Sequence, residues 1–229
     1  MGTEEKDLDY VRMETKHVVG GSAVGSPSPF TAYGVWKGMK SCAREVFGSP
    51  DLAGLVVAVQ GVGSVGASLC KYIREEGARL IVADINQDKV NRAVEEWQAV
   101  AVAPDDIYRQ KCDIFAPCAG GGVINDETVP LLQCRIVAGA ANNVIKEKQF
   151  GNTLKEKGVL YAPDYIINAG GLIFVEMRRQ EEDDFDKIRA VIDRIEGRLA
   201  EIFRRSREQG LLPEEVADLW AEEKLREKC

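Results

Sequence analysis

Residues 55–66 read Leu-Val-Val-Ala-Val-Gln-Gly-Val-Gly-Ser-Val-Gly, and this stretch decides the fold. Its first five residues form a continuous apolar run rich in valine, which is typical of a strand buried on both faces of a parallel sheet. Gly61, Gly63 and Gly66 follow with the spacing Gly-x-Gly-x-x-Gly, and a segment with one apolar helical face comes next. The stretch therefore predicts a strand, a tight turn and a helix.

The same alternation continues along the chain. Short apolar runs are separated by segments long enough for a crossover, and most of those segments have a helical pattern. The runs are residues 55–59, 79–83, 99–102, 113–116, 135–138 and 159–162. Alternating strands and helices build a parallel sheet with helices on both faces. We predict an α/β fold, a doubly wound Rossmann sheet with flanking N- and C-terminal helices.

Helical patterns lie on both sides of this region. After the turn Ser26-Pro-Ser-Pro, we expect a helix that runs to about Phe47. In the tail, apolar residues from Ile188 to Phe203 recur at helical spacing and predict one amphipathic helix. Gly210 is expected to end that helix, and Pro213, followed by two glutamates, is expected to begin another.

The composition excludes several classes of protein. A hydrophobic fraction of 45% and a charged fraction of 29% are those of an ordinary globular protein. The net charge of -7 argues against nucleic acid or an anionic membrane as the main partner. No apolar run reaches the about 18 residues that span a bilayer, and the charged N-terminus has no signal core, so we expect a cytoplasmic protein. Six cysteines without a Cys-x-x-Cys pair and a single histidine, His17, predict no metal site.

The glycines and the second strand together indicate a dinucleotide site. A lone Gly-x-Gly-x-x-Gly is weak, but here it follows a buried strand and opens a helix. Gly61 would allow the turn, Gly63 would let the backbone approach a pyrophosphate, and Gly66 would let helix and strand pack closely. Asp84 ends the second strand, where a carboxylate binds the adenosine ribose and repels the extra phosphate of NADP. We therefore expect NAD; the alternative is that Asp84 caps the next helix.

Several blocks beyond the glycine turn carry a family resemblance. They are Ser26-Pro-Ser-Pro-Phe-Thr-Ala-Tyr-Gly-Val, Val57-Ala-Val-Gln-Gly-Val-Gly-Ser-Val-Gly, Cys112-Asp-Ile-Phe-Ala-Pro-Cys-Ala, Val137-Ala-Gly-Ala-Ala-Asn-Asn and Tyr161-Ala-Pro-Asp-Tyr-Ile-Ile-Asn-Ala-Gly-Gly. In their order and spacing they make the chain resemble the glutamate/leucine/phenylalanine/valine dehydrogenases, especially the leucine and phenylalanine branch. A different Rossmann oxidoreductase is disfavoured by the last block.

The resemblance implies a set of cofactor-binding residues. They are Thr31, Gly61, Gly63, Ser64, Val65, Gly66, Asp84, Cys118, Ala119, Asn142 and Asn168. In the family, the position of Thr31 holds the nicotinamide carboxamide, and that of Asn142 lies near the nicotinamide and its ribose. The position of Asn168 touches both the nicotinamide side and the substrate. The alternative for the two asparagines is loop capping by side-chain hydrogen bonds.

The resemblance also implies a substrate class. Asn168, Leu172 and Val175 match positions that contact the substrate in the leucine-specific branch. Apolar residues there would suit leucine, valine or phenylalanine, and the implied activity is NAD-dependent oxidative deamination of an apolar L-amino acid to the 2-keto acid. Ordinary core packing is the alternative for Leu172 and Val175. Phe174 and the stretch Glu176-Met177-Arg178-Arg179 depart from the leucine dehydrogenase pattern, which leaves the individual amino acid open.

Family members carry a catalytic lysine and aspartate in an N-terminal domain, and we expect no catalytic residue within this sequence. Residues 1–25 are expected to be a remnant of that domain and the connector, 26–185 the Rossmann NAD-binding domain, and 186–229 C-terminal helices packed on it. Truncation, a natural single-domain NAD-binding protein without turnover, and a separate chain for the other domain remain as alternatives. A homo-oligomer and a monomer are both compatible with the sequence.

Overall fold

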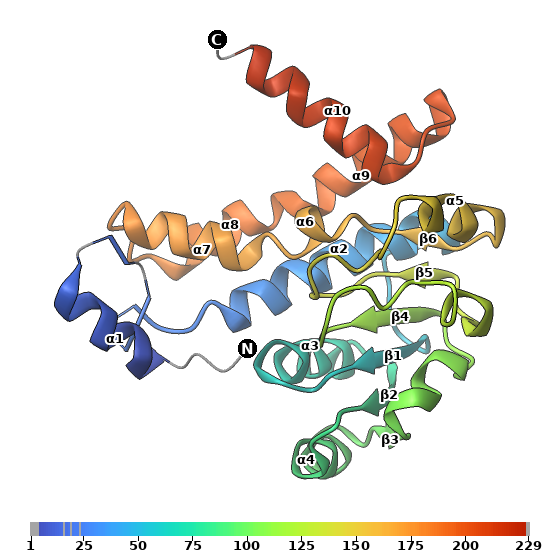
Figure 1. Ribbon diagram of the computed structural model, residues 1–229, viewed down its shortest axis with the longest axis horizontal. Coiled ribbons are helices and arrows are strands. Elements are labelled where there is room, and N and C mark those ends of the chain that lie inside the picture. The colour runs from blue at the N-terminus through green and yellow to red at the C-terminus, as the bar shows by residue number, and fades with distance from the viewer. Residues whose placement is uncertain (1–4, 16, 19, 23, 228–229) are drawn as a thin grey trace.

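The computed structural model describes residues 5–15, 17–18, 20–22 and 24–227. Within them, six parallel strands form one sheet in the order β3-β2-β1-β4-β5-β6 (Figure 1). The strands are β1 (Val56–Gln60), β2 (Arg79–Ala83), β3 (Val100–Ala101), β4 (Ile114–Pro117), β5 (Ile136–Val137) and β6 (Leu160–Tyr161). All six overlap the apolar runs, with Gln60 and Pro117 just beyond them, and the first strand lies in the middle of the sheet. The doubly wound α/β fold is confirmed.

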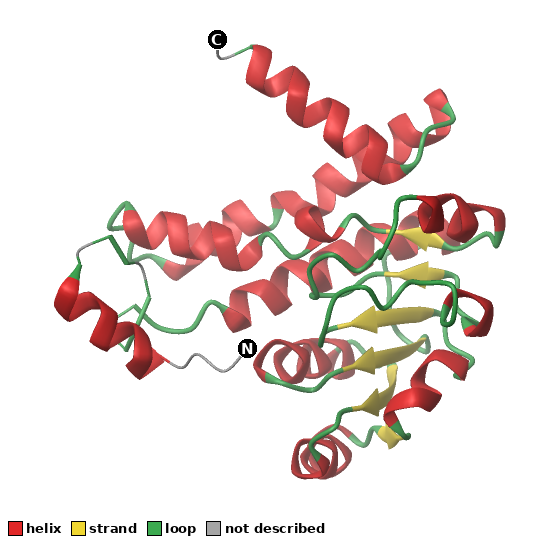
Figure 2. Ribbon diagram, in the orientation of Figure 1, coloured by secondary structure: helices red, strands yellow, loops and turns green. Residues whose placement is uncertain are grey.

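Helices connect the strands and flank the sheet (Figure 2). The α-helices are α1 (Glu5–Glu14), α2 (Ser28–Phe47), α3 (Ser64–Glu75), α4 (Gln87–Trp97), α5 (Gln149–Glu156), α6 (Asp164–Ile167), α7 (Gly170–Arg179), α8 (Phe185–Ile192), α9 (Arg194–Gln209) and α10 (Pro213–Arg226). Two 3₁₀ turns, η1 (Pro104–Arg109) and η2 (Val129–Leu131), complete the elements. None of the helices described is both long enough and apolar enough to cross a membrane.

Successive residues of the central strand β1 belong to two different hydrophobic cores, because side chains alternate between the faces of a sheet. Val57 and Val59 of β1 belong to a core that includes residues of α2, α3 and the C-terminal helices. Ala58 between them belongs to a second core with Ile107 of η1 and Leu154 of α5. The central strands are therefore buried on both faces, which explains why their sequences are continuously apolar, whereas both residues of the edge strand β3 are exposed.

The tail contains a break that the periodicity did not predict. The expectation of one helix through residues 188–203 is wrong, because α8 ends at Ile192 and α9 begins at Arg194. Asp193 between them keeps right-handed helical angles, φ -53° and ψ -27°, so the apolar stripe continues across the break. Its carboxylate accepts a hydrogen bond from the Tyr33 hydroxyl at 2.7 Å and lies 3.0 Å from the Lys37 ammonium. The break thus coincides with an anchor to α2.

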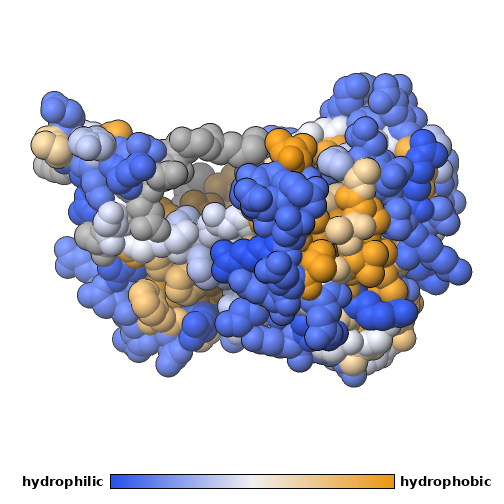
Figure 3. All heavy atoms as spheres, turned by 90° about the horizontal axis from the view of Figure 1, so that it is seen from below, coloured by the Kyte–Doolittle hydropathy of each residue, from blue (hydrophilic) through white to orange (hydrophobic). Residues whose placement is uncertain are grey.

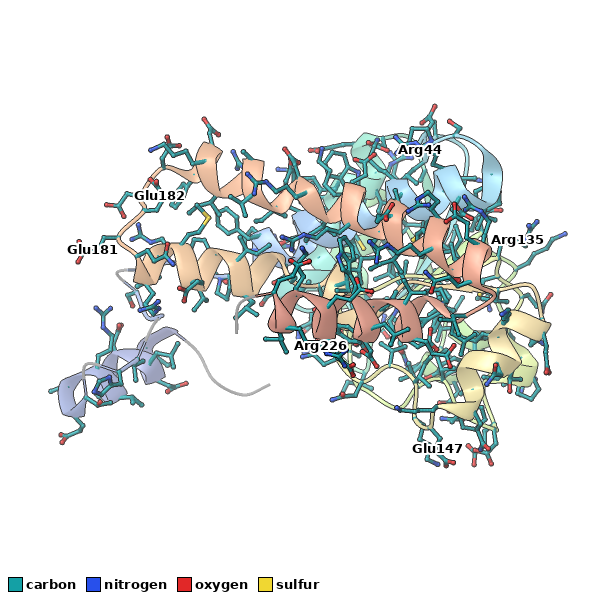
Figure 4. All side chains as sticks on the ribbon, turned by 90° about the horizontal axis from the view of Figure 1, so that it is seen from above. Arg44, Arg135, Glu147, Glu181, Glu182 and Arg226 are labelled. Atoms are coloured by element: carbon teal, nitrogen blue, oxygen red, sulfur yellow. The ribbon has the colours of Figure 1, made fainter. Side chains whose placement is uncertain are left out.

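The C-terminal helices are part of the main core. Leu199 and Phe203 of α9 are buried in the same cluster as Val35 and Met39 of α2. Seen from above, α9 runs along the body of the molecule and α10 lies beside it, with Arg226 near its end (Figure 4). Gly210 separates the two helices in a left-handed conformation, φ 72°, as its position in the sequence predicted.

The outer edge of the sheet exposes apolar side chains. Val100 of the edge strand is 60% exposed, and Ile85, which follows β2, is 94% exposed. From below, hydrophobic residues gather on the half of the molecule away from α1 (Figure 3). Glu181 and Glu182 lie at the turn between α7 and α8 (Figure 4), where the Glu182 carboxylate accepts a hydrogen bond from the Asp184 amide and pairs with Lys187 of α8.

Candidate functional site

The glycine turn between β1 and α3 has the geometry that its spacing predicts. Gly61 has φ +91°, a conformation that favours glycine, and a methyl group on it would lie 2.8 Å from the Ala119 side chain. A methyl group on Gly66 would collide with the Gly61 carbonyl oxygen, so the first turn of α3 can lie directly against the loop. Two of the three glycines are therefore required by the packing of the protein itself.

Gly63 differs, because a methyl group on it would meet nothing within 4 Å. It is the N-cap residue of α3, and no side chain caps that helix. The first intrahelical bond runs from the Ala67 amide to the Gly63 carbonyl at 2.8 Å, so the amides of Ser64, Val65 and Gly66 precede the hydrogen-bonded ladder. Open space in front of free amides at the positive end of a helix suits an anionic diphosphate.

Asp84 ties the end of β2 to the glycine turn. One carboxylate oxygen accepts a hydrogen bond from the Val62 amide at 2.8 Å, and the other accepts one from the Asn86 amide at 2.9 Å. The N-cap of α4 is Asn86, whose side chain accepts from the Lys89 amide. Asp84 is therefore not the cap of α4. It is half-exposed, and each oxygen has a second lone pair with which a ribose hydroxyl could bond.

An open cavity of about 550 Å³ lies beside this turn. Its lining combines the start of α2, the first turn of α3, the segment after β5, and α6 with the start of α7. The lining residues are Pro27, Thr31, Val65, Ala140, Asn142, Tyr165, Asn168, Ala169, Gly171, Leu172 and Val175. Six of these, namely Thr31, Val65, Asn142, Asn168, Leu172 and Val175, are residues that the sequence singles out.

The two asparagines bind each other at this cavity. The Asn168 amide nitrogen donates to the Asn142 side-chain oxygen at 2.6 Å and lies 3.2 Å from the Ala140 carbonyl oxygen. This pairing uses a donor of Asn168 and an acceptor of Asn142. The Asn168 amide oxygen remains as an acceptor, and the Asn142 amide nitrogen remains as a donor. A carboxamide or a ribose hydroxyl needs such a combination.

Thr31 is held at the cavity by close packing between α2 and α7. Its hydroxyl donates to the Pro27 carbonyl at 3.1 Å, and a methyl group on Gly171 would collide with that hydroxyl. The neighbouring Phe30 stacks on Phe174 with ring centroids 4.3 Å apart. With its proton used in this way, the Thr31 oxygen can accept a hydrogen bond from a ligand.

Cys118 and Ala119 lie at the glycine turn and are not among the cavity-lining residues. The Cys118 amide donates to the Gln60 carbonyl at 2.7 Å, which continues the pairing of β1 and β4 beyond the strand end. Burial raises the pKa of the Cys118 thiol to about 12, so the thiol is neutral and unreactive at neutral pH. Asp84 likewise lies at the glycine turn and is not among the described residues that line the cavity.

Sequence reasoning missed several lining residues. Pro27, Ala140 and Ala169 are small or apolar, and only their places within the quoted blocks could have indicated them. Tyr165 carries a hydroxyl that could have indicated it, but Asn168, three residues later in the same block, was selected instead. Among the described residues that line the cavity there is no lysine, histidine or carboxylate. The cavity as described can bind and orient ligands, and it offers no general base.

The fold and this site define a dinucleotide-binding α/β domain. The sequence profile of the Glutamate/Leucine/Phenylalanine/Valine dehydrogenase family matches residues 82–211, and the chain belongs to that family. Its relatives are amino-acid dehydrogenases, and the family uses NAD(P). The expectation drawn from the motif blocks is confirmed at this level.

Individual relatives support the assignment. Leucine dehydrogenase of Thermoactinomyces intermedius is 47% identical over 98% of this chain and 62% of its own length. L-tryptophan dehydrogenase of Nostoc punctiforme is 40% identical over 96% of this chain, again covering 62% of the relative. The crystal structure of that tryptophan dehydrogenase matches with a TM-score of 0.88, over 97% of this chain and 64% of the other. The chain thus spans less than two thirds of the length of these relatives.

Proposed function

We propose that this chain supplies the NAD-binding part of an enzyme that oxidatively deaminates an apolar L-amino acid of the leucine, valine or phenylalanine class to its 2-keto acid. One observation carries the proposal. The open cavity places Thr31, Asn142 and Asn168, from three separate segments, beside the free amides of α3. Such a combination offers polar groups for a carboxamide and ribose within reach of a diphosphate site.

The residues present fit NAD. The free amides at the start of α3 and the open space at Gly63 would hold the diphosphate, and Asp84 would accept hydrogen bonds from the adenosine ribose. Thr31 and the asparagine pair would bind the nicotinamide carboxamide and its ribose. When bound, the nicotinamide ring would accept the hydride of the substrate α-carbon.

Leu172 and Val175 are the proposed substrate contacts on α7. Leu172 is 72% exposed, although it is a large apolar residue, and both side chains line the cavity. An apolar ligand side chain packed there would remove that surface from water. Phe174, which departs from the leucine dehydrogenase pattern, is buried against Phe30 instead. This departure therefore lies outside the proposed substrate contacts.

A second candidate is a protein that binds NAD without turnover. The observation that favours it is the absence of lysine, histidine and carboxylate from the described lining of the cavity, because positioned acids and bases contribute about 10²–10⁴ in rate. Incubation of the chain with NAD and L-leucine, L-valine or L-phenylalanine separates the two. Steady production of NADH would exclude the candidate without turnover.

The test of the proposal is calorimetric titration of the chain with NAD and with NADP. We expect preference for NAD, and we expect Asp84→Ala to shift the ratio of the two affinities toward NADP by about tenfold or more. Two like charges about 4 Å apart repel by about 1–4 kcal/mol in partly solvated surroundings. Because this variant also removes the acceptor of the Val62 amide, the ratio is the readout and the absolute affinity is not.

Asp88→Ala is the matched control. It removes an exposed carboxylate from the first turn of α4 without touching the glycine turn, and the ratio should change by less than about twofold. An unchanged preference in Asp84→Ala would contradict the ribose assignment. Failure of the unaltered chain to bind either dinucleotide would overturn the proposal as a whole.

A further inference from the structure

Tyr165 lies between two cavities. Its side chain lines the proposed NAD cavity, one helical turn before Asn168, and it also lines a second cavity of about 440 Å³. The second cavity is formed largely by α5, the segment before it, and α10. Among the described lining residues, Tyr165 is the residue that both cavities share. The residue is 47% exposed, so surrounding protein does not enclose it fully.

The hydroxyl of Tyr165 is bound to the C-terminal helix. It donates to a carboxylate oxygen of Asp218 at 2.6 Å and lies 3.2 Å from the Glu214 carbonyl oxygen. Both partners belong to α10. Burial, and next the bond to Asp218, raise the pKa of the Tyr165 hydroxyl, so it remains a protonated donor at neutral pH. A short bond from a hydroxyl to a carboxylate is among the stronger hydrogen bonds of proteins.

We propose that Tyr165 is a positioning residue whose hydrogen bond to Asp218 fixes its ring as a wall of the nicotinamide side of the cavity. Through this bond, α10 would set how tightly the nicotinamide half of NAD is held. The inference rests on the proposed function, because it assumes that NAD occupies the cavity. The inference gives α10 a part in NAD binding, although α10 supplies none of the described residues that line the cavity.

The physical reason lies in the freedom of a half-exposed side chain. Fixing an aromatic side chain costs conformational entropy, and a ligand that fixes it must supply that free energy. The bond to Asp218 fixes the ring before the ligand arrives. Without it, the ring would retain other rotamers, and the nicotinamide half would bind to a wall that is only partly formed. The adenosine half, at the glycine turn and Asp84, would not be affected.

The test compares NAD with ADP-ribose, which lacks the nicotinamide, in calorimetric titrations of the whole chain. We expect Tyr165→Phe and Asp218→Ala each to weaken NAD binding by about fivefold to tenfold, the value of one hydrogen bond. ADP-ribose binding should change by less than about twofold. The double variant should be no weaker than either single variant, and Asp218→Asn, which keeps an acceptor, should recover most of the affinity for NAD.

Tyr33→Phe is the matched control, because it removes the same kind of bond, from the Tyr33 hydroxyl to Asp193, outside the cavity. It should leave both affinities within about twofold of the unaltered chain. Equal losses for NAD and ADP-ribose in Tyr165→Phe, or no loss for either, would overturn the inference. If the unaltered chain fails to bind ADP-ribose, the proposed function fails instead. Melting curves of each variant verify folding.

Discussion

Asp84 shows what a single residue in a sequence can and cannot indicate. Its place at the end of the second strand predicts a carboxylate at the carboxyl edge of the sheet, and the structure places it there. Its bond to the Val62 amide could not be predicted, because it depends on how closely the turn approaches the end of β2. The structure shows that Asn86, and not Asp84, caps α4, while ribose binding by Asp84 stays a prediction.

The Glu214 carboxylate lies in a largely buried environment that disfavours its charged form. One of its carboxylate oxygens is buried and finds no hydrogen-bond partner within the described structure. The other lies close to Gly151, where any added methyl group would collide with it. Burial, and then the nearby carboxylates of Glu215, Asp218 and Asp164, raise the pKa of Glu214. A group whose pKa is raised on folding stabilises the protein below its unfolded pKa and loses that contribution as the pH rises through the folded value.

We therefore expect Glu214→Gln to increase the free energy of unfolding at neutral pH by about 1 kcal/mol, since it removes a buried charge that one backbone hydrogen bond offsets only in part. The gain should disappear toward pH 4, where the carboxyl group of the unaltered chain is protonated. Urea unfolding at a series of pH values measures both effects. Glu215→Gln is the matched control and should lower the free energy of unfolding by less than about 1 kcal/mol, because the glutamine oxygen can still accept from the Leu212 amide and only the negative charge at the start of α10 is lost. A loss of stability in Glu214→Gln at neutral pH would contradict the interpretation.

At the scale of elements, the glycine turn separates packing from ligand binding. We expect Gly66→Ala to destabilise the fold by several kcal/mol, because the added methyl group meets the Gly61 carbonyl oxygen, which cannot move freely. Gly63→Ala should cost about 1 kcal/mol, the value of a poorer N-cap, because its methyl group meets only open space. It should nevertheless weaken NAD binding by about tenfold or more, since the methyl group would occupy the space proposed for the diphosphate.

Thermal unfolding and NAD titration of the two glycine variants separate these effects. The result that would contradict the assignment is a Gly63→Ala variant that binds NAD as tightly as the unaltered chain. Equal destabilisation by the two substitutions would instead show that the packing argument is wrong. The two variants carry the same substitution at neighbouring positions. A difference between them therefore reports the surroundings of each glycine and not the type of substitution.

The existence of elements was easier to predict than their ends. All six strands follow from continuous apolar runs, yet β3, β5 and β6 each comprise two residues where the runs have four. Ladder hydrogen bonds decide where a strand ends, and these depend on the neighbouring strand; the edge strand β3 has only β2. The break at Asp193 escaped prediction for a similar reason, since its partners Tyr33 and Lys37 are distant in sequence.

The sequence could predict those residues of the candidate site that are polar or glycine and that lie within the motif blocks. Thr31, Asn142 and Asn168 could be named beforehand, and the structure brings them to one cavity. The pairing of the two asparagines and the contact between Thr31 and Gly171 could not be named, because they depend on tertiary packing. The bond between Tyr165 and Asp218 joins elements that no local pattern connects.

At the scale of the whole molecule, the sheet and the C-terminal helices share one core. We expect Phe203→Ala on α9, a residue with 1% exposure, to reduce the free energy of unfolding by about 3–5 kcal/mol. Because Phe203 packs in the same cluster as β1 and α2, the loss should appear in one cooperative transition. Urea unfolding followed by tryptophan fluorescence and by circular dichroism should give coincident curves. Gln209→Ala, an exposed position on the same helix, should change the stability by less than about 0.5 kcal/mol.

Two separate transitions in that experiment would contradict the shared core. They would instead indicate that residues 186–229 unfold independently of residues 26–185, the boundaries expected from the sequence. A single transition would agree with helices that pack on the sheet as an integral layer. The measurement therefore also tests the division of the chain into parts.

The anchors between α2 and the tail have a consequence for how the chain folds as it is synthesised. Tyr33 bonds to Asp193 and Arg44 to Glu196, pairs that lie 160 and 152 positions apart. The partners of α2 in α9 and at the α8–α9 break thus leave the ribosome only after all six strands. At about 5–20 residues per second, α2 and the early strands wait for seconds with apolar surface exposed to other chains. Slowing translation across the tail would lengthen that interval, and chaperones that cover apolar segments would have their greatest effect there.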